Sequence, residues 1–172
     1  QVSVESDGPL AAVLRLTHTL RLPAKAGQSL AGRSEAETEQ QVTTFVTVAK
    51  GDPCLHFSTQ MDNHVENHRL RVLFPTGYHT NSFFTKLPFD MQRWPIAHED
   101  SSQSREPDTL VHPSQGITYL QDEQDARNAL GVYTRGLYEV EVTDNEERAV
   151  ALTLMRAAQS ETGTLTPSGI QM

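Results

Sequence analysis

The sequence is poor in several features that define particular protein classes. It has a single cysteine, Cys54, so the internal disulfides of small secreted domains are excluded. No apolar run approaches the roughly 18 residues needed to cross a bilayer, and no charged and apolar leader begins the chain. No Asn-x-Ser/Thr glycosylation acceptor is present. We therefore expect no membrane partner and a cytoplasmic, bacterial location.

Basic residues are also scarce. The chain has 14 Lys and Arg residues against 22 Asp and Glu residues, which gives a net charge of −8. Nucleic-acid binding depends on neutralising phosphates with Lys and Arg, so we expect no nucleic-acid partner. The sequence has no Gly-rich phosphate loop, no nucleophile elbow and no cysteine pair.

Aromatic residues make up only 6% of the chain, although hydrophobic residues reach 37%, so an economical core is expected. A length of 172 residues suits one domain, and we predict a single β-sandwich domain over residues 1–172. The chain starts at Gln1, in residues that already resemble a strand before the turn at residues 7–9. These features predict a fragment of a longer protein.

Two-residue alternation predicts three strands in the first third of the chain. Residues 10–22 are apolar at even positions, with His18 as the exception. Residues 42–49 alternate again and are rich in β-branched side chains, and turn residues 51–53 precede a further run at 55–61. We predict that the last two runs form a hairpin.

The next predicted strand spans residues 70–74 and has Arg69 and Arg71 on its opposite face. It ends at residues 75–77, where proline removes a ladder donor, and we expect it to pair with residues 55–61. Four short apolar runs follow, and they predict a meander of four strands. The runs are residues 117–120, 130–133, 137–142 and 149–155.

Two segments lose this periodicity, near residues 24–41 and 95–115, and both are interpreted as exposed loops. The only plausible helical turn is at residues 122–130. Many short strands without a long helical period predict an all-β fold of two packed antiparallel sheets.

Asp62-Asn63-His64-Val65-Glu66-Asn67-His68 is a candidate metal site, because two histidines four apart on a helix could grip zinc. Here, however, Glu66 lies midway between the histidines and the segment links two strand patterns. A polar turn, in which Asp62 and Asn63 bond nearby backbone groups, is therefore favoured, and His68 then starts the next strand.

Glu139 and Glu141 are candidate glycosidase carboxylates, since glycoside hydrolysis uses two carboxyl groups. They lie two apart on one strand and share a face, so they do not bracket a substrate. A solvated outer face is favoured. Arg69 and Arg71 could bind an anion, or could pair with cross-strand carboxylates nearby in the sequence.

The aromatic residues Trp94, Phe89 and Phe83-Phe84 could form a stacking platform for a sugar. Core packing is the favoured interpretation, because large aromatic side chains are usually buried.

Several sequence blocks resemble the β-rich region of bacterial family 38 glycoside hydrolases, and they are specific as an ensemble. The longest is residues 62–77, DNHVENHRLRVLFPTG. The later blocks are GVYTRGLYEVEV at 131–142, ALTLMR at 151–156 and PSGIQM at 167–172. The arginine-rich strand and the final PSGI stretch are particularly similar to bacterial mannosylglycerate hydrolases. The resemblance implies a mutarotase-like β-sandwich, of the type found in the C-terminal half of family 38 enzymes.

The resemblance also implies a parent enzyme that hydrolyses α-mannosides with retention, using an aspartate nucleophile and zinc held by histidines and aspartates. Those residues belong to the family's N-terminal α/β domain, and no block of this chain matches their motifs. We therefore assign no catalytic, cofactor-binding or metal residue here. Zinc is expected only in the missing catalytic domain, and the isolated chain is expected to be inactive.

Three functional hypotheses follow. The first is a domain that supports the N-terminal catalytic domain of the same polypeptide and meets α-mannoside only through that parent, with Arg135 and the Gly136 turn as candidate contacts. The second is an independent carbohydrate-binding module that uses Trp94 and Phe89. The third is a free-standing mutarotase-like enzyme, which needs a histidine and a carboxylate converging on one sheet face.

Overall fold

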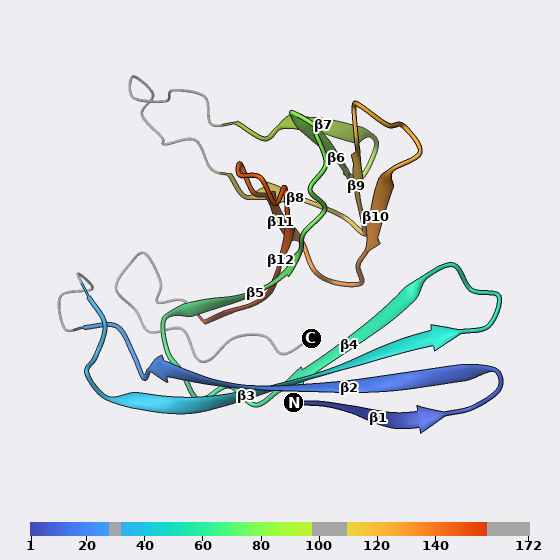
Figure 1. Ribbon diagram of the computed structural model, residues 1–172. Helices are drawn as coiled ribbons and strands as arrows, with labels where there is room; N and C mark the ends of the chain where they lie inside the picture. Colours follow the sequence, from blue (N-terminus) through green and yellow to red (C-terminus); the bar gives the residue numbers. More distant parts are fainter. Residues whose placement is uncertain (28–31, 98–109, 158–172) are drawn as a thin grey trace, which may run out of the picture. The chain divides into compact units, whose positions relative to one another are not determined.

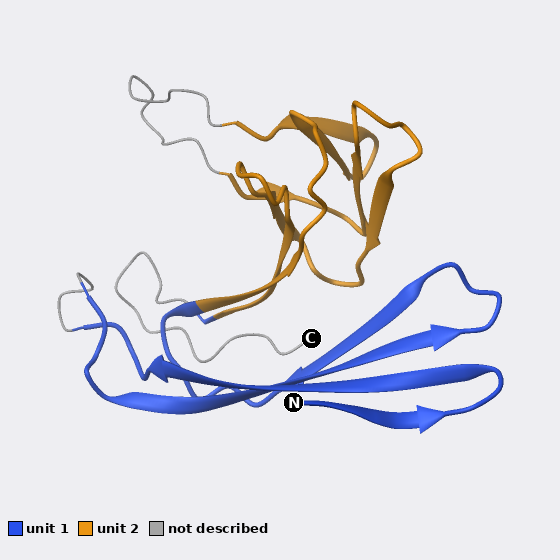
Figure 2. Cartoon of the chain, viewed as in Figure 1, with its two compact units in different colours: residues 1–68, 157–168 blue, residues 69–156, 169–172 orange. Residues whose placement is uncertain are grey.

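In a computed structural model, residues 1–27, 32–97 and 110–157 are described, and they contain strands but no helix (Figure 1). No segment in these ranges is therefore a helix able to span a membrane. The described residues fall into two compact units, residues 1–68 with 157 and residues 69–156 (Figure 2). The prediction of an all-β, antiparallel fold is confirmed. The prediction of a single domain over residues 1–172 stays a prediction.

Unit 1 consists of one sheet in the order β1-β2-β3-β4. Its strands are β1 (Val2–Asp7), β2 (Ala11–Pro23), β3 (Glu37–Ala49) and β4 (Leu55–Met61). The predicted hairpin is the β3–β4 pair, and Gly51 in its turn has φ +80°, a conformation that favours glycine. Asp52 Oδ1 accepts a 2.9 Å hydrogen bond from the Cys54 amide and closes the same turn.

The predicted loop at residues 24–41 is too long by five residues, because β3 begins at Glu37. Residues 37–41 continue the β2–β3 ladder as far as the pair Pro23↔Glu37. The sequence did not predict this part of β3 because its residues are polar on both faces of the sheet. Glu39 pairs with Arg21 at 3.3 Å on one face, and Gln40 is buried on the other.

Unit 2 contains two four-stranded sheets, in the orders β10-β9-β6-β7 and β5-β12-β11-β8. The first uses β6 (Ser82–Lys86), β7 (Met91–Pro95), β9 (Ile117–Gln121) and β10 (Ala129–Tyr133). The second uses β5 (His68–Phe74), β8 (His112–Pro113), β11 (Glu139–Val142) and β12 (Val150–Ala157).

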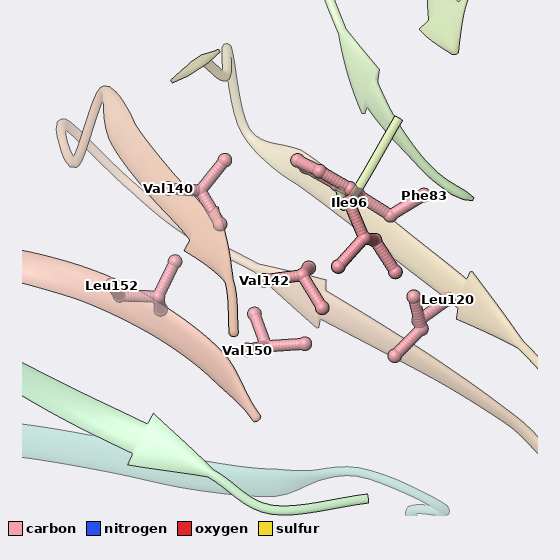
Figure 3. Packing of buried hydrophobic residues seen from close by; sticks show 7 residues of the cluster. All are labelled: Phe83, Ile96, Leu120, Val140, Val142, Val150 and Leu152. Atoms are coloured by element: carbon pink, nitrogen blue, oxygen red, sulfur yellow. The ribbon is translucent and has the colours of Figure 1, made fainter. Parts of the chain in front are cut away.

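One hydrophobic core joins the two sheets of unit 2. Figure 3 shows its buried side chains, which come from both sheets and from the residue after β7. They are Phe83, Ile96, Leu120, Val140, Val142, Val150 and Leu152. Sheets that pack face to face in this way form a sandwich. The strand alternation seen in the sequence therefore marks real inner and outer faces in unit 2.

Two predicted strand pairings are wrong. β5 lies beside β12 and not beside β4, because Val72 and Phe74 pack against the core of unit 2. The four short runs after residue 116 all form strands, but they do not make one meander. β9 and β10 pair in one sheet and β11 and β12 in the other, and Gly136, with φ +77°, lies in the connection between the sheets.

The remaining irregular segments also differ from expectation. Residues 122–128 contain no helical turn, since Asp122 and Asp125 accept hydrogen bonds from the amides of Gln124 and Arg127 and form successive tight turns. The predicted loop at 95–115 is packed near both ends, where Ile96 and Ser114 are buried. Residues 98–109 of that loop lie outside the described residues.

Candidate functional site

The candidate metal segment, residues 62–68, forms a polar turn that a buried glutamine holds in place. Gln40 Nε2 donates to the Asp62 carbonyl at 2.6 Å, and Gln40 Oε1 accepts from the His64 amide at 3.0 Å. Asn63 bonds both the amide and the carbonyl of Val65, at 3.3 and 2.9 Å. The predicted backbone bonding is confirmed for Asn63, whereas the Asp62 side chain lies beside His64 instead.

The two histidines of this turn have different environments. His64 Nε2 lies 3.5 Å from Asp62 Oδ2, and both side chains are largely exposed. His68 starts β5, as predicted, and its Nδ1 atom is covered without a hydrogen-bond partner. Burial, reinforced by the nearby Arg33 cation, lowers the pKa of His68 below its usual value and so favours the neutral ring. Within residues 1–27, 32–97 and 110–157, no group of three or more His, Cys, Asp or Glu side chains could hold a metal ion.

Glu141 is the counter-ion of both candidate arginines. Its Oε2 atom lies 2.5 Å from Arg71 Nη1 and 3.8 Å from Arg69 Nη2, and its side chain is 14% exposed. The prediction that these arginines pair with a cross-strand carboxylate is thus confirmed. The carboxylate is not nearby in the sequence, however, because Glu141 lies 70 residues after Arg71. Because β12 lies between β5 and β11, the arginines reach across a strand whose residue opposite Glu141 is the small Ala151.

Glu139 has a separate partner, Arg156, at 2.8 Å, and both side chains are more exposed than that of Glu141. The two carboxylates therefore pair with different arginines, and they do not act as a pair around one ligand. The favoured interpretation of a solvated outer face fits Glu139, whereas Glu141 is mostly covered.

The four candidate aromatic residues do not form one platform. Phe83 is buried, and the Trp94 ring stacks on His112 with 4.3 Å between centroids while its Nε1 donates to Thr85 at 2.8 Å. Core packing is thus confirmed for these two. Phe89 lies alone and fully exposed in the turn between β6 and β7, and Phe84 faces the opposite side of the sheet from Phe83.

Two histidine and carboxylate pairs in the described residues are local. His56 Nε2, at the start of β4, lies 2.7 Å from Asp52 in the preceding turn, and His64 contacts Asp62 within its own turn. The hydrogen bond from His56 holds the pKa of Asp52 below its usual value. Neither pair joins two strands across a sheet face. Arg135 and Gly136 lie in the connection from β10 to β11, where Arg135 is exposed.

The clearest surface feature lies on the sheet of unit 1, whose two faces differ in character. One face carries the row Val4, Leu14, Val46 and Phe57 in register, followed by Val48 and Leu55; we call these six residues the apolar face. Four of them remain well exposed: Val4 at 65%, Leu55 at 57%, Phe57 at 49% and Val48 at 46%.

The opposite face of the same sheet is mainly polar, although Val13 and Phe45 also lie on it. Arg15 pairs with Glu5 at 3.7 Å, and Arg21 pairs with Glu39. Alternation in the sequence indicated both faces, but it could not show that the apolar one stays uncovered. Exposed contiguous apolar patches mark interaction sites, so this face is the best candidate for a binding surface in unit 1.

Comparison with known proteins identifies the family. The profile of the family "Glycosyl hydrolases family 38 C-terminal domain" matches residues 1–163. The chain belongs to this family. The crystal structure of an alpha-mannosidase from Enterococcus faecalis is similar with a TM-score of 0.80 at 26% identity, over 91% of this chain and 18% of that one.

Two further relatives agree with this family. A family 38 glycosyl hydrolase structure from Enterococcus faecalis has a TM-score of 0.77 at 26% identity, and covers 91% of this chain and 19% of that one. A protein named "Putative mannosylglycerate hydrolase" from Halalkalibacterium halodurans is 24% identical over 91% of this chain and 18% of its own length. This family 38 domain therefore spans less than a fifth of the relatives it matches.

Proposed function

We propose that this chain is the C-terminal β domain of a family 38 glycoside hydrolase that acts on α-mannosides, and that it supports the separate zinc-dependent catalytic domain. The names of the relatives, alpha-mannosidase and mannosylglycerate hydrolase, support the substrate class. Their greater length supports a parent protein in which most of the polypeptide lies outside this domain.

The observation that carries the supporting role is the exposed apolar face of unit 1. Burying a side chain such as Leu55 stabilises a protein by about 1.5–3 kcal/mol, so a face of this kind favours being covered. Its partner in this proposal is another part of the same enzyme. Retaining glycosidases hold two carboxyl groups about 5–5.5 Å apart, and rigid packing behind the catalytic domain helps to keep that spacing.

The residues that the structure describes do not fit a zinc site, because no group of three candidate ligands comes together in them. In this proposal the metal and the bond-breaking carboxylates reside in the catalytic domain. The domain's own ionic contacts, Glu141 with its arginines and Glu139 with Arg156, are structural. Measurable hydrolysis of an aryl α-mannoside by the isolated 172-residue chain would contradict this division of labour.

A substitution on the apolar face tests the supporting role. Leu55→Glu should leave the isolated chain as stable as before, because Leu55 is exposed there. In the full-length enzyme it should bury an unpaired charge at a covered interface and lower both the melting temperature and kcat on an aryl α-mannoside.

Ser58→Glu is the matched control, because Ser58 is exposed on the polar face of the same strand. It should be neutral in both forms of the protein. Equal behaviour of the two variants in the full-length enzyme would show that the apolar face stays exposed there, and the supporting role would fail.

A further inference from the structure

A second distinctive surface lies on the outer face of sheet β10-β9-β6-β7 in unit 2, opposite the hydrophobic core. Registers place Gly131 beside Tyr119, Tyr119 beside Phe84, and Phe84 beside Arg93, in one row across all four strands. Neighbouring strands lie about 4.8 Å apart, so the row extends for about 14 Å. We call Tyr133, Tyr119, Phe84 and Arg93 the aromatic strip.

Tyr133 belongs to this row because its ring lies over Gly131. A Cβ atom at Gly131 would come within 3.4 Å of Tyr133 Cε2, so the glycine makes room for the ring. Tyr133 is 72% exposed, whereas Tyr119 and Phe84 are half-buried. The strip therefore combines two half-buried rings with one exposed ring that lies over Gly131.

Contacts with neighbouring residues fix the two half-buried rings and the guanidinium group of the strip. The rings of Phe84 and Tyr119 contact each other with 6.3 Å between centroids and 50° between planes. Arg93 Nε donates a 2.9 Å hydrogen bond to Ser82 Oγ on the neighbouring strand. A surface fixed before binding loses less conformational entropy when a ligand arrives.

The charge of this face differs from that of the whole chain. The chain has 22 acidic and 14 basic residues, yet the outward positions of β6, β7, β9 and β10 hold no Asp or Glu. Their charged residues are Lys86 and Arg93. No carboxylate at these strand positions would repel an anionic ligand.

The two exposed faces of the chain suit different occupants. The apolar face of unit 1 is largely aliphatic, which suits another protein layer. The aromatic strip instead combines ring faces with tyrosine hydroxyls and a guanidinium group. A pyranose ring has the matching chemistry, because its C–H face packs on aromatic rings while its hydroxyls need hydrogen-bond partners.

We propose that the aromatic strip is a carbohydrate-binding subsite, at which a pyranoside stacks on Tyr133 and Tyr119 and hydrogen-bonds Arg93. The identity of the sugar as a mannopyranoside rests on the proposed function. The ligand could be a neutral mannoside or a mannoside with an acidic aglycone. Both carry the mannopyranosyl ring that would stack on the strip. Arg93 would then contact a hydroxyl in the first ligand and the carboxylate in the second.

Calorimetric titration of the 172-residue chain tests the subsite, with α-mannobiose as the neutral ligand and mannosylglycerate as the acidic one. We expect millimolar binding of at least one ligand. Tyr133→Ala should weaken it roughly three- to tenfold, because one stacking contact is lost. Arg93→Gln should weaken the acidic ligand more than the neutral one.

Tyr138→Ala is the matched control, because Tyr138 is also an exposed tyrosine of unit 2, at 60%, but lies off the strip. It should bind like the original chain. No binding of either ligand would overturn the proposal, and so would equal losses in Tyr133→Ala and Tyr138→Ala. Concentration-dependent self-association that Tyr133→Ala removes, without sugar binding, would identify a protein contact instead and would also overturn it.

Hydrolysis by the full-length enzyme separates this proposal from the proposed function. An active α-mannosidase whose excised domain binds no sugar would refute the subsite alone. A domain that binds mannoside through Tyr133, in a full-length protein that does not cleave mannosides, would refute only the proposed function.

Discussion

Replacing Glu141 by glutamine should destabilise unit 2 more than any other single neutralisation of a carboxylate on β11. Glu141 lies on β11 and holds the cations of Arg71 and Arg69 on β5, across the intervening strand β12. Glutamine keeps the size of the side chain but removes its charge. The two arginines, each 29% exposed, would then share a covered face without a counter-ion.

The magnitude follows from the burial and geometry of the contacts. A hydrogen bond to a charged group contributes about 1.5–3 kcal/mol, and the 2.5 Å contact with Arg71 is of this kind. Arg69, at 3.8 Å, adds a weaker attraction, and partial exposure of both arginines screens it. A net loss of about 2 kcal/mol is expected, which corresponds to a fall in melting temperature of about 4–8 °C for a chain of this size.

Thermal and urea unfolding, followed by circular dichroism, measure this loss, and Glu139→Gln is the matched control. Glu139 is on the same strand and face, but its pair with Arg156 is exposed at 36% and 48%, so less than about 1 kcal/mol should be lost. If Glu141→Gln melts within a degree of the original chain, or no lower than Glu139→Gln, the three-residue cluster contributes nothing to stability.

Two further predictions concern the turn at residues 62–68. Gln40→Ala should cost about 1–3 kcal/mol, because it leaves the His64 amide and the Asp62 carbonyl without their partner, and amide hydrogen exchange should rise in this turn first. The lowered pKa of His68 makes the unfolded chain bind a proton at higher pH than the folded one, so its contribution to stability is complete above about pH 6.5 and is lost as pH falls through the folded pKa. His68→Gln should therefore lose less stability between pH 8 and pH 5 than the original chain, as measured by urea midpoints. An identical loss would contradict the lowered pKa of His68.

Many strand positions were predictable because the signal for them is local, whereas β6 and β7 were not predicted. The alternation of β2 and the turn residues around Gly51 need no knowledge of distant parts of the chain. The apolar side of β5 was also visible at Leu70, Val72 and Phe74. These residues must face a core wherever that core lies, so the existence of the strand could be predicted without its partner.

Strand partners were not predictable in the same way. A strand such as β5 offers the same ladder groups on either edge, and only tertiary packing decides that β12 and not β4 lies beside it. The salt bridge from Arg71 to Glu141 spans 70 residues, and no spacing rule connects the two positions. For the same reason the polar Gln40 suggested a loop. Its side chain in fact hydrogen-bonds the Asp62 carbonyl, in a turn more than twenty residues further along the chain.

The contrast between the two exposed faces suits the proposed supporting role. The sheet of unit 1 carries charged pairs such as Arg15–Glu5 on one side and exposed apolar side chains such as Leu14 on the other. Exposure of the apolar side to water is unfavourable, and a neighbouring protein layer would remove that exposure. The aromatic strip carries polar groups that water can satisfy, so it does not need such a layer and can stay open to a small ligand. If the apolar face is covered in the parent enzyme and the strip is not, the same domain both stabilises the catalytic part and offers sugar a second place to bind.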